Sequence, residues 1–236
     1  MRAHTLALSL AGAFVLSACS SLNPFSSEGK PPALKPLASP VKMNEGWRAR
    51  VDDAGVFVFQ PAISGGAVFA TGKDGEVTRI ESGRTVWKTP LKTRVSGGVG
   101  SDGNLVAVGT PKGEVIALDA ETGQVKWRVF INAEVLAAPA VSGGMVVVRS
   151  ADSRLFGLDA SDGKRRWTYQ RATPALALRN AAGVVMEGNF IIAGYPGGKL
   201  VAVNGANGSL AWEGTVAVPR GATELERVAD ITSLPV

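Results

Sequence analysis

Short apolar runs separated by glycine-containing turns recur along most of the chain. Four of these runs follow Ser-Gly-Gly, Asp-Gly or Glu-Gly turns, at residues 67–70, 105–108, 145–148 and 190–193. Each run is apolar at consecutive positions, which is typical of a strand that is covered on both faces. No long stretch of the repeats shows the three-and-four spacing of an amphipathic helix. The pattern therefore predicts an all-β fold.

The tryptophans divide this pattern into repeats. They are spaced by 40, 40, 40 and 45 residues, at Trp47, Trp87, Trp127, Trp167 and Trp212. A glycine lies four residues before each of the last four, at Gly83, Gly123, Gly163 and Gly208. One tryptophan per 40–45 residues indicates a β-propeller built from four-stranded antiparallel blades. We expect the glycine to turn the last hairpin and the tryptophan to pack between neighbouring blades.

The repeats account for about four blades. A fifth unit begins near Asp230, and Trp47 lies in a predicted outer strand, residues 45–51, with no blade before it. In closed propellers an N-terminal strand of this kind often completes the last blade. We therefore expect the chain to be a truncated piece of a longer propeller, residues 42–236 forming its partial propeller domain.

The first 18 residues have the pattern of a secretory leader. Arg2 precedes an apolar stretch, residues 5–15, that is too short to span a bilayer as a helix. Leu16-Ser17-Ala18-Cys19 resembles the lipobox of bacterial lipoproteins, which implies cleavage before Cys19 and lipid attached to it. The alternative is an ordinary signal peptide that happens to contain a cysteine. Ser20, in place of an aspartate, favours sorting to the outer membrane.

Residues 19–41 are rich in proline and serine and poor in apolar side chains. Such a segment stays extended and gains little from packing, so we expect a tether between the lipid and the propeller. The protein is accordingly expected on the outer membrane, lipid-anchored and facing the periplasm.

Charge and chemistry narrow the possible functions. The formal net charge is +5, or +4 without Arg2, and the basic residues are scattered, whereas a nucleic-acid site more often forms one dense patch. The single histidine, His4, lies in the leader, and Cys19 is the single cysteine. Ser-His-Asp and Cys-His catalysis and zinc sites built on these residues are therefore excluded.

Carboxylate chemistry and oxygen-ligated metals stay possible. However, the acids mostly occupy turns, where their usual role is to cap the backbone: Asp74, Asp102, Asp152 and Asp162. We predict no catalytic residue, no metal, no cofactor, no small-molecule substrate and no nucleic-acid partner.

The Asp-Ala-x-x-Gly-x-x-x-Trp units resemble the repeats of pyrroloquinoline-quinone-type propellers, whose enzymes are much longer. The lipobox, the tether, the tryptophan ladder and the segments 173–179 and 221–230 together are more similar to the BamB family of the β-barrel assembly machinery. That resemblance implies an eight-bladed propeller, of which this chain carries about half. It also implies a non-enzymatic scaffold that docks on the POTRA domains of BamA beside other assembly subunits.

The resemblance places partner-binding residues at Leu176, Leu178, Arg179 and Asp230. Family members often carry a second acid two residues after Asp230, where this chain has Thr232. Equivalent connections between blades emerge on one face of a propeller, so these four residues can form one patch, with apolar anchors and a polar rim. The pattern alone leaves another possibility open. The two leucines alternate with alanines, as they would on one face of an inner strand in the core.

Two other functions compete with the scaffold. One is a fragment of a periplasmic quinone-dependent dehydrogenase, which the missing cofactor residues and the lipobox argue against. The other is a stand-alone propeller that binds carbohydrate or peptide, which the chemistry of the sequence does not exclude.

Overall fold

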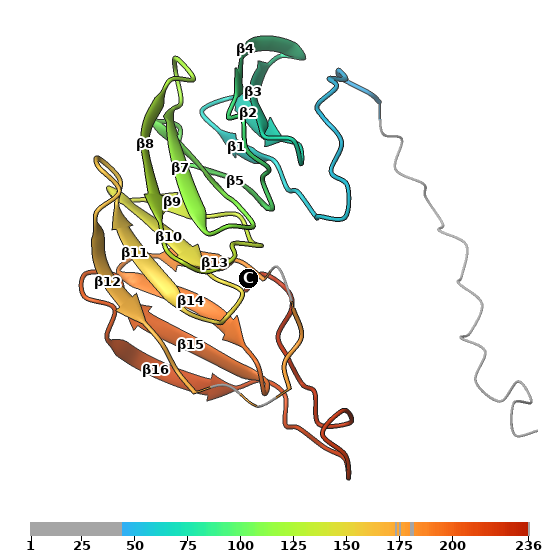
Figure 1. Ribbon diagram of the computed structural model, residues 1–236, viewed down its shortest axis with the longest axis vertical. Helices are drawn as coiled ribbons and strands as arrows, with labels where there is room; N and C mark the ends of the chain where they lie inside the picture. Colours follow the sequence, from blue (N-terminus) through green and yellow to red (C-terminus); the bar gives the residue numbers. More distant parts are fainter. Residues whose placement is uncertain (1–43, 173, 175, 180–181, 236) are drawn as a thin grey trace, which may run out of the picture. The chain divides into compact units, whose positions relative to one another are not determined.

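The computed structural model describes residues 44–172, 174, 176–179 and 182–235, and Glu45–Val236 form one compact unit (Figure 1). The described strands build four antiparallel sheets of four strands each. In every sheet the strands lie side by side in chain order, which is the meander of a propeller blade. The predicted all-β fold of four-stranded antiparallel blades is confirmed. The predicted leader, residues 1–18, and the predicted tether, residues 19–41 with Cys19, lie outside the described residues.

The sheets follow one another along the chain. The first contains β1 (Ala62–Ser64), β2 (Ala67–Thr71), β3 (Glu76–Glu81) and β4 (Arg84–Pro90). The second contains β5 (Gly97–Ser101), β6 (Leu105–Gly109), β7 (Glu114–Asp119) and β8 (Val125–Phe130). The third contains β9 (Ala140–Ser142), β10 (Met145–Arg149), β11 (Leu155–Asp159) and β12 (Arg165–Tyr169). The fourth contains β13 (Val184–Glu187), β14 (Phe190–Tyr195), β15 (Lys199–Asn204) and β16 (Leu210–Thr215).

The hydrophobic core is divided into three clusters, each between two successive sheets. Strand β6 shows how the sequence produces this arrangement. Val106 and Val108 belong to the cluster shared with the first sheet, whereas Leu105 and Ala107 belong to the cluster shared with the third. Successive side chains of a strand point to opposite faces, so a continuous apolar run serves two cores.

Each of three tryptophans reaches across to the last hairpin of the following sheet. The indole N–H of Trp127 donates to the carbonyl oxygen of Ala160 at 2.9 Å, and Trp87 and Trp167 make the same bond to Ala120 and Gly205. The hairpin glycine lies under the ring. Gly163 has φ of +74°, and a Cβ there would lie 2.7 Å from Trp127. The glycine therefore serves both the turn and the packing of the ring, and the tryptophans pack between blades as predicted.

The first and last tryptophans are more exposed than those between sheets. Trp127 is 8% exposed, whereas Trp47 and Trp212 are 47% and 43% exposed. Trp47 packs against Gly83 of the first sheet, in the manner of the other tryptophans. However, the prediction of a strand over residues 45–51 is wrong, since the chain there forms no strand. A strand needs a ladder of hydrogen bonds to a neighbour, and no described segment pairs with these residues.

The first strands of successive sheets lie next to one another. Contacts join β1 to β5, β5 to β9 and β9 to β13. The fourth strands, β4, β8, β12 and β16, lie at the opposite edges of their sheets. Consequently each connection runs from the fourth-strand edge of one sheet to the first-strand edge of the next.

Candidate functional site

The connection between β12 and β13 presents two leucines to solvent. Leu176 and Leu178 are 43% and 51% exposed and lie outside any strand. The inner strand of the fourth sheet begins later, at Val184. The two leucines are therefore not core residues of an inner strand, and we call them the leucine pair.

Asp230 lies beside this connection and binds its backbone. One oxygen of the Asp230 carboxylate accepts the N–H of Leu178 at 2.6 Å, and the other accepts the N–H of Gly197 at 3.2 Å. Gly197 belongs to the turn between β14 and β15. The structure thus brings Asp230 and Leu178 together across 52 residues, and the carboxylate joins two loops of the protein itself.

Arg179 is paired within the chain as well. Its guanidinium binds Glu134 through two hydrogen bonds, Nη2 to Oε1 at 2.6 Å and Nε to Oε2 at 3.0 Å. Bonding to the Glu134 carboxylate raises the pKa of Arg179. Such a paired geometry fixes the orientation of the guanidinium plane. Glu134 lies in the connection between β8 and β9, which is the equivalent connection one repeat earlier. The sequence analysis missed Glu134, and its place in that connection is the only signal that could have identified it.

Two successive connections between sheets and the segment that follows β16 are therefore linked by charged side chains. Glu134 holds Arg179, and Asp230 holds Leu178. Arg179 and Asp230, the residues predicted to form a polar rim, both have partners within this chain. The side chains of the leucine pair stay exposed. Chemically, residues 176–179 expose apolar side chains beside an arginine and are held by hydrogen bonds to other segments, which suits contact with another protein.

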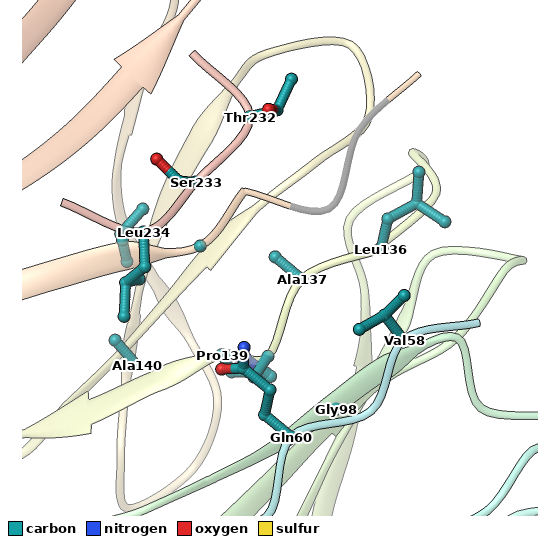
Figure 2. A pocket seen from close by; sticks show the side chains of 13 residues that line it. Val58, Gln60, Gly98, Leu136, Ala137, Pro139, Ala140, Thr232, Ser233 and Leu234 are labelled. Carbon is teal, nitrogen blue, oxygen red and sulfur yellow. The ribbon is translucent and has the colours of Figure 1, made fainter. Parts of the chain in front are cut away.

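A pocket of about 520 Å³ lies among the first strands of the sheets (Figure 2). In that view Val58 and Gln60 are on one side, Thr232 and Ser233 on the other, and Ala137 and Pro139 lie between them. The described residues that line the pocket are all uncharged: Val58, Gln60, Gly98, Leu136, Ala137, Ala138, Pro139, Ala140, Gly183, Val184, Thr232, Ser233 and Leu234. The lining therefore offers no side chain for acid–base chemistry or for neutralising an ionic ligand.

The acids in the hairpins have structural contacts. The Asp102 carboxylate accepts the N–H groups of Asn104 and Leu105, both at 2.9 Å, and Asp162 accepts the N–H of Lys164 at 2.9 Å. For Asp102 and Asp162 these are the turn-capping roles expected from the sequence, whereas the Asp152 carboxylate accepts from the Ser150 hydroxyl and the Arg154 guanidinium. Within the described part of the chain, no three acidic, histidine or cysteine residues gather where they could hold a metal. No helix in that part is long and apolar enough to cross a membrane.

Comparison with solved structures supports the fold assignment. BamB from Moraxella catarrhalis superposes with a TM-score of 0.71 at 28% identity, over 75% of this chain and 55% of that one. A quinohemoprotein alcohol dehydrogenase from Pseudomonas putida superposes with a TM-score of 0.54 at 20% identity, over 74% of this chain and 35% of that one. At that identity the dehydrogenase shows a shared fold alone.

Comparison with curated sequences is more specific. The outer membrane protein assembly factor BamB of Bordetella pertussis is 43% identical over 99% of this chain and 61% of its own length. The protein of the same name from Pseudomonas aeruginosa is 48% identical over 97% of this chain and 60% of its own length. The chain spans about half to three-fifths of the length of such relatives.

The family assignment combines these likenesses with the geometry of the repeats. The sequence model of one family, described as outer membrane protein assembly factor BamB, matches residues 73–236. This range covers all three bonds between a tryptophan and the hairpin of the following sheet, and it covers the contact between Asp230 and Leu178. The chain therefore belongs to the family of the outer membrane protein assembly factor BamB.

Proposed function

We propose that the protein is a non-enzymatic scaffold of the outer-membrane β-barrel assembly complex. In this proposal it docks on the POTRA domains of BamA and supports the folding and insertion of outer-membrane proteins. The observation that carries the proposal is the leucine pair, exposed on a loop whose backbone is bound by Asp230. The relatives named as assembly factors support it.

A fixed loop is a favourable docking element. An interface gains less when a loop must first be ordered, so hydrogen bonds that already hold the loop reduce the cost of binding. The bonds from Leu178 to Asp230 and from Arg179 to Glu134 do this here. Exposed leucines then supply apolar area at the centre of the contact, and the Arg179 guanidinium sets the orientation.

The proposal of a scaffold in place of an enzyme rests on the residues present. The hairpin carboxylates are used to cap turns, and the pocket among the first strands has an uncharged lining. The likeness to a quinohemoprotein dehydrogenase is confined to the fold. No described group gives the dehydrogenase hypothesis specific support.

A matched pair of variants tests the docking surface. Leu178 and Leu210 are both 51% exposed, but Leu210 lies on β16 and outside the connection. We expect Leu178→Ala to weaken binding of purified POTRA domains by more than about 1 kcal/mol, as truncation of an interface anchor does. Leu210→Ala should bind like the parent chain. Equal affinities for both variants would show that the leucine pair is not the docking site.

The proposed location requires a lipid on Cys19. In this proposal residues 1–18 are removed, Cys19 is acylated, and residues 19–41 connect the lipid to the propeller in the periplasm. Radioactive palmitate should label the protein in cells, and Cys19→Ala should abolish the label and release the protein from outer-membrane fractions. Labelling that persists in Cys19→Ala would contradict the proposed anchor.

A further inference from the structure

Tyr195 occupies an unusual place at the end of β14. Its side chain is fully buried, and two guanidinium groups lie over its ring. The Cζ atom of Arg149 is 5.3 Å from the ring centroid, and that of Arg171 is 5.5 Å from it. Cations over an aromatic face are attracted by its quadrupole, more strongly when water is excluded. Burial also raises the pKa of the Tyr195 phenol, so the ring faces both cations as a neutral group.

The two arginines hold opposite ends of the connection that carries the leucine pair. Arg171 lies at its start, just after β12. Arg149, on β10, is buried and donates from Nη1 to the carbonyl oxygen of Ala182 at 3.0 Å, just before β13 begins. Both ends of the connection are therefore tied to cations that rest on the same ring.

The backbone around Tyr195 holds the segment that follows β16, at Asp230 and Ile231. The carbonyl oxygen of Tyr195 accepts the N–H of Ile231 at 3.4 Å, and Gly197, two residues further, donates to Asp230. Gly194 lies directly against Ile231, because a Cβ on Gly194 would be 2.3 Å from Ile231 Cγ2. The end of β14 thus fixes Asp230, which in turn binds the N–H of Leu178.

We infer that Tyr195 is the positioning residue of the docking surface. Its ring holds the arginines at both ends of the connection that carries the leucine pair and Arg179, and the backbone around it holds Asp230. This inference rests on the proposed function for its purpose, but the geometry of the loop can be measured without any partner. Within the Tyr195 side chain, the ring holds the two arginines and the hydroxyl takes no part. Within the described part of the chain, the buried Tyr195 hydroxyl has no hydrogen-bond partner.

Two substitutions at Tyr195 separate the ring from the hydroxyl. Tyr195→Phe keeps the ring, and Tyr195→Leu keeps an apolar side chain without a face for the cations. In the whole chain, we expect hydrogen exchange at the Leu178 amide to be about tenfold faster in Tyr195→Leu than in the parent. In Tyr195→Phe it should stay within about twofold of the parent. If both variants speed this exchange equally, the ring is not responsible and the inference is overturned.

A second site keeps the test decisive if Tyr195→Leu does not fold. Arg171 is partly exposed, and Glu213, its ion-pair partner, also binds Lys199 at 3.4 Å, so Arg171→Gln leaves no carboxylate unpaired. Arg171→Gln should also accelerate exchange at Leu178. Arg165→Gln, an exposed change on β12, is the matched control and should leave it unchanged. Parental exchange at Leu178 in Arg171→Gln would overturn the inference.

Binding of purified POTRA domains separates this inference from the proposed function. Both loop-loosening variants, Tyr195→Leu and Arg171→Gln, should bind at least about fivefold more weakly than the parent, because part of the binding energy then goes into ordering the loop. If exchange at Leu178 accelerates while affinity is unchanged, Tyr195 still positions the loop. In that case it is the proposed docking site that fails.

Discussion

Single carboxylates in the last hairpins fix the turns on which the tryptophans dock. Asp119 accepts the N–H groups of Glu121 and Thr122, and Asp159 accepts the N–H of Ser161. Asn204 takes the same position in the fourth sheet and accepts the N–H of Ala206. Hydrogen bonds from the turn lower the pKa of the Asp119 carboxyl. Hydrogen bonds from Ser161 and Arg166 lower the pKa of the Asp159 carboxyl. The side-chain amide of Asn204 caps its turn without a charge.

The lowered pKa of Asp159 predicts a pH dependence of stability. Its ordinary value is 3.8, and in the folded chain it is lower. Below pH 3.8 the unfolded chain therefore binds a proton that the folded chain does not, so the free energy of unfolding decreases as the pH falls. We expect Asp159→Asn to be less stable than the parent at pH 7, with a difference that shrinks below about pH 4. Urea unfolding at a series of pH values measures this, and a constant difference from pH 7 to 3 would contradict it.

Two turn glycines differ in whether a tryptophan ring packs against them, and this difference predicts different losses of stability. Gly163 and Gly143 both have positive φ, but a Cβ on Gly163 would meet Trp127 at 2.7 Å, whereas one on Gly143 would meet nothing within 4 Å. Gly143→Ala should cost about 1–2 kcal/mol for the left-handed backbone. Gly163→Ala should cost about 1–3 kcal/mol more, because the ring must shift. Equal losses in urea unfolding would mean that the ring is not held against the hairpin.

At the scale of elements, the sequence identified the repeats because their chemistry is local. A glycine four residues before a tryptophan belongs to one hairpin, and an apolar run belongs to one strand. The sequence does not reveal the register shift between the third and fourth strands of every described sheet, for example between Gly157 and Leu158. A one-residue irregularity depends on pairing, and hydrophobic patterns carry little sign of it. The strand predicted at residues 45–51 is wrong for the same reason, because the position of Trp47 gives no information about whether a neighbouring strand is present.

Trp127 and Trp212 occupy the same position in their repeats, but only Trp127 packs against the hairpin of a following described sheet. Their replacement by alanine should therefore reduce the free energy of unfolding by different amounts. Trp127 is buried and donates a hydrogen bond to the following hairpin, so Trp127→Ala should cost about 3–5 kcal/mol. Trp212 is 43% exposed, and its replacement should cost about 1 kcal/mol. Lys112→Ala, in an exposed turn, should change stability by less than about 0.5 kcal/mol. Similar losses for Trp127→Ala and Trp212→Ala in chemical denaturation would argue against docking between sheets.

At the scale of the whole compact unit, the candidate site depends on contacts between distant residues. Leu176, Leu178, Arg179 and Asp230 came from family resemblance, and the hydrophobic pattern alone favoured the core for the leucines. Tyr195 could not be found from the sequence, and for Glu134 the only signal was its place in the preceding connection. Glu134 contacts Arg179 across 45 residues, and Tyr195 contacts Arg149, on β10, across 46 residues. Such contacts follow from the stacking of blades, which places equivalent connections side by side.

The ion pair of Arg179 and Glu134 joins two connections between sheets, and in the proposed function Arg179 also contacts the partner. Arg179→Glu alone sets two carboxylates against each other, so it disturbs the loop as well as the charge that it presents. The double exchange Glu134→Arg with Arg179→Glu restores the ion pair and reverses the exposed charge. If the guanidinium contacts an acidic group of the POTRA domains, Arg179→Glu should weaken binding by about 1–3 kcal/mol.

We expect the double exchange to have the melting temperature of the parent, because the restored ion pair holds the loop again. Its binding should remain at least about 1 kcal/mol weaker than that of the parent, because the charge presented to the partner is still reversed. Titration calorimetry with purified POTRA domains and thermal unfolding of the same samples measure the two effects separately. A charge reversal at Lys112, in a turn of an earlier sheet, is the control and should leave both unchanged. Parental affinity in the double exchange would assign Arg179 to holding the loop alone, and the docking energy would then rest on the leucine pair.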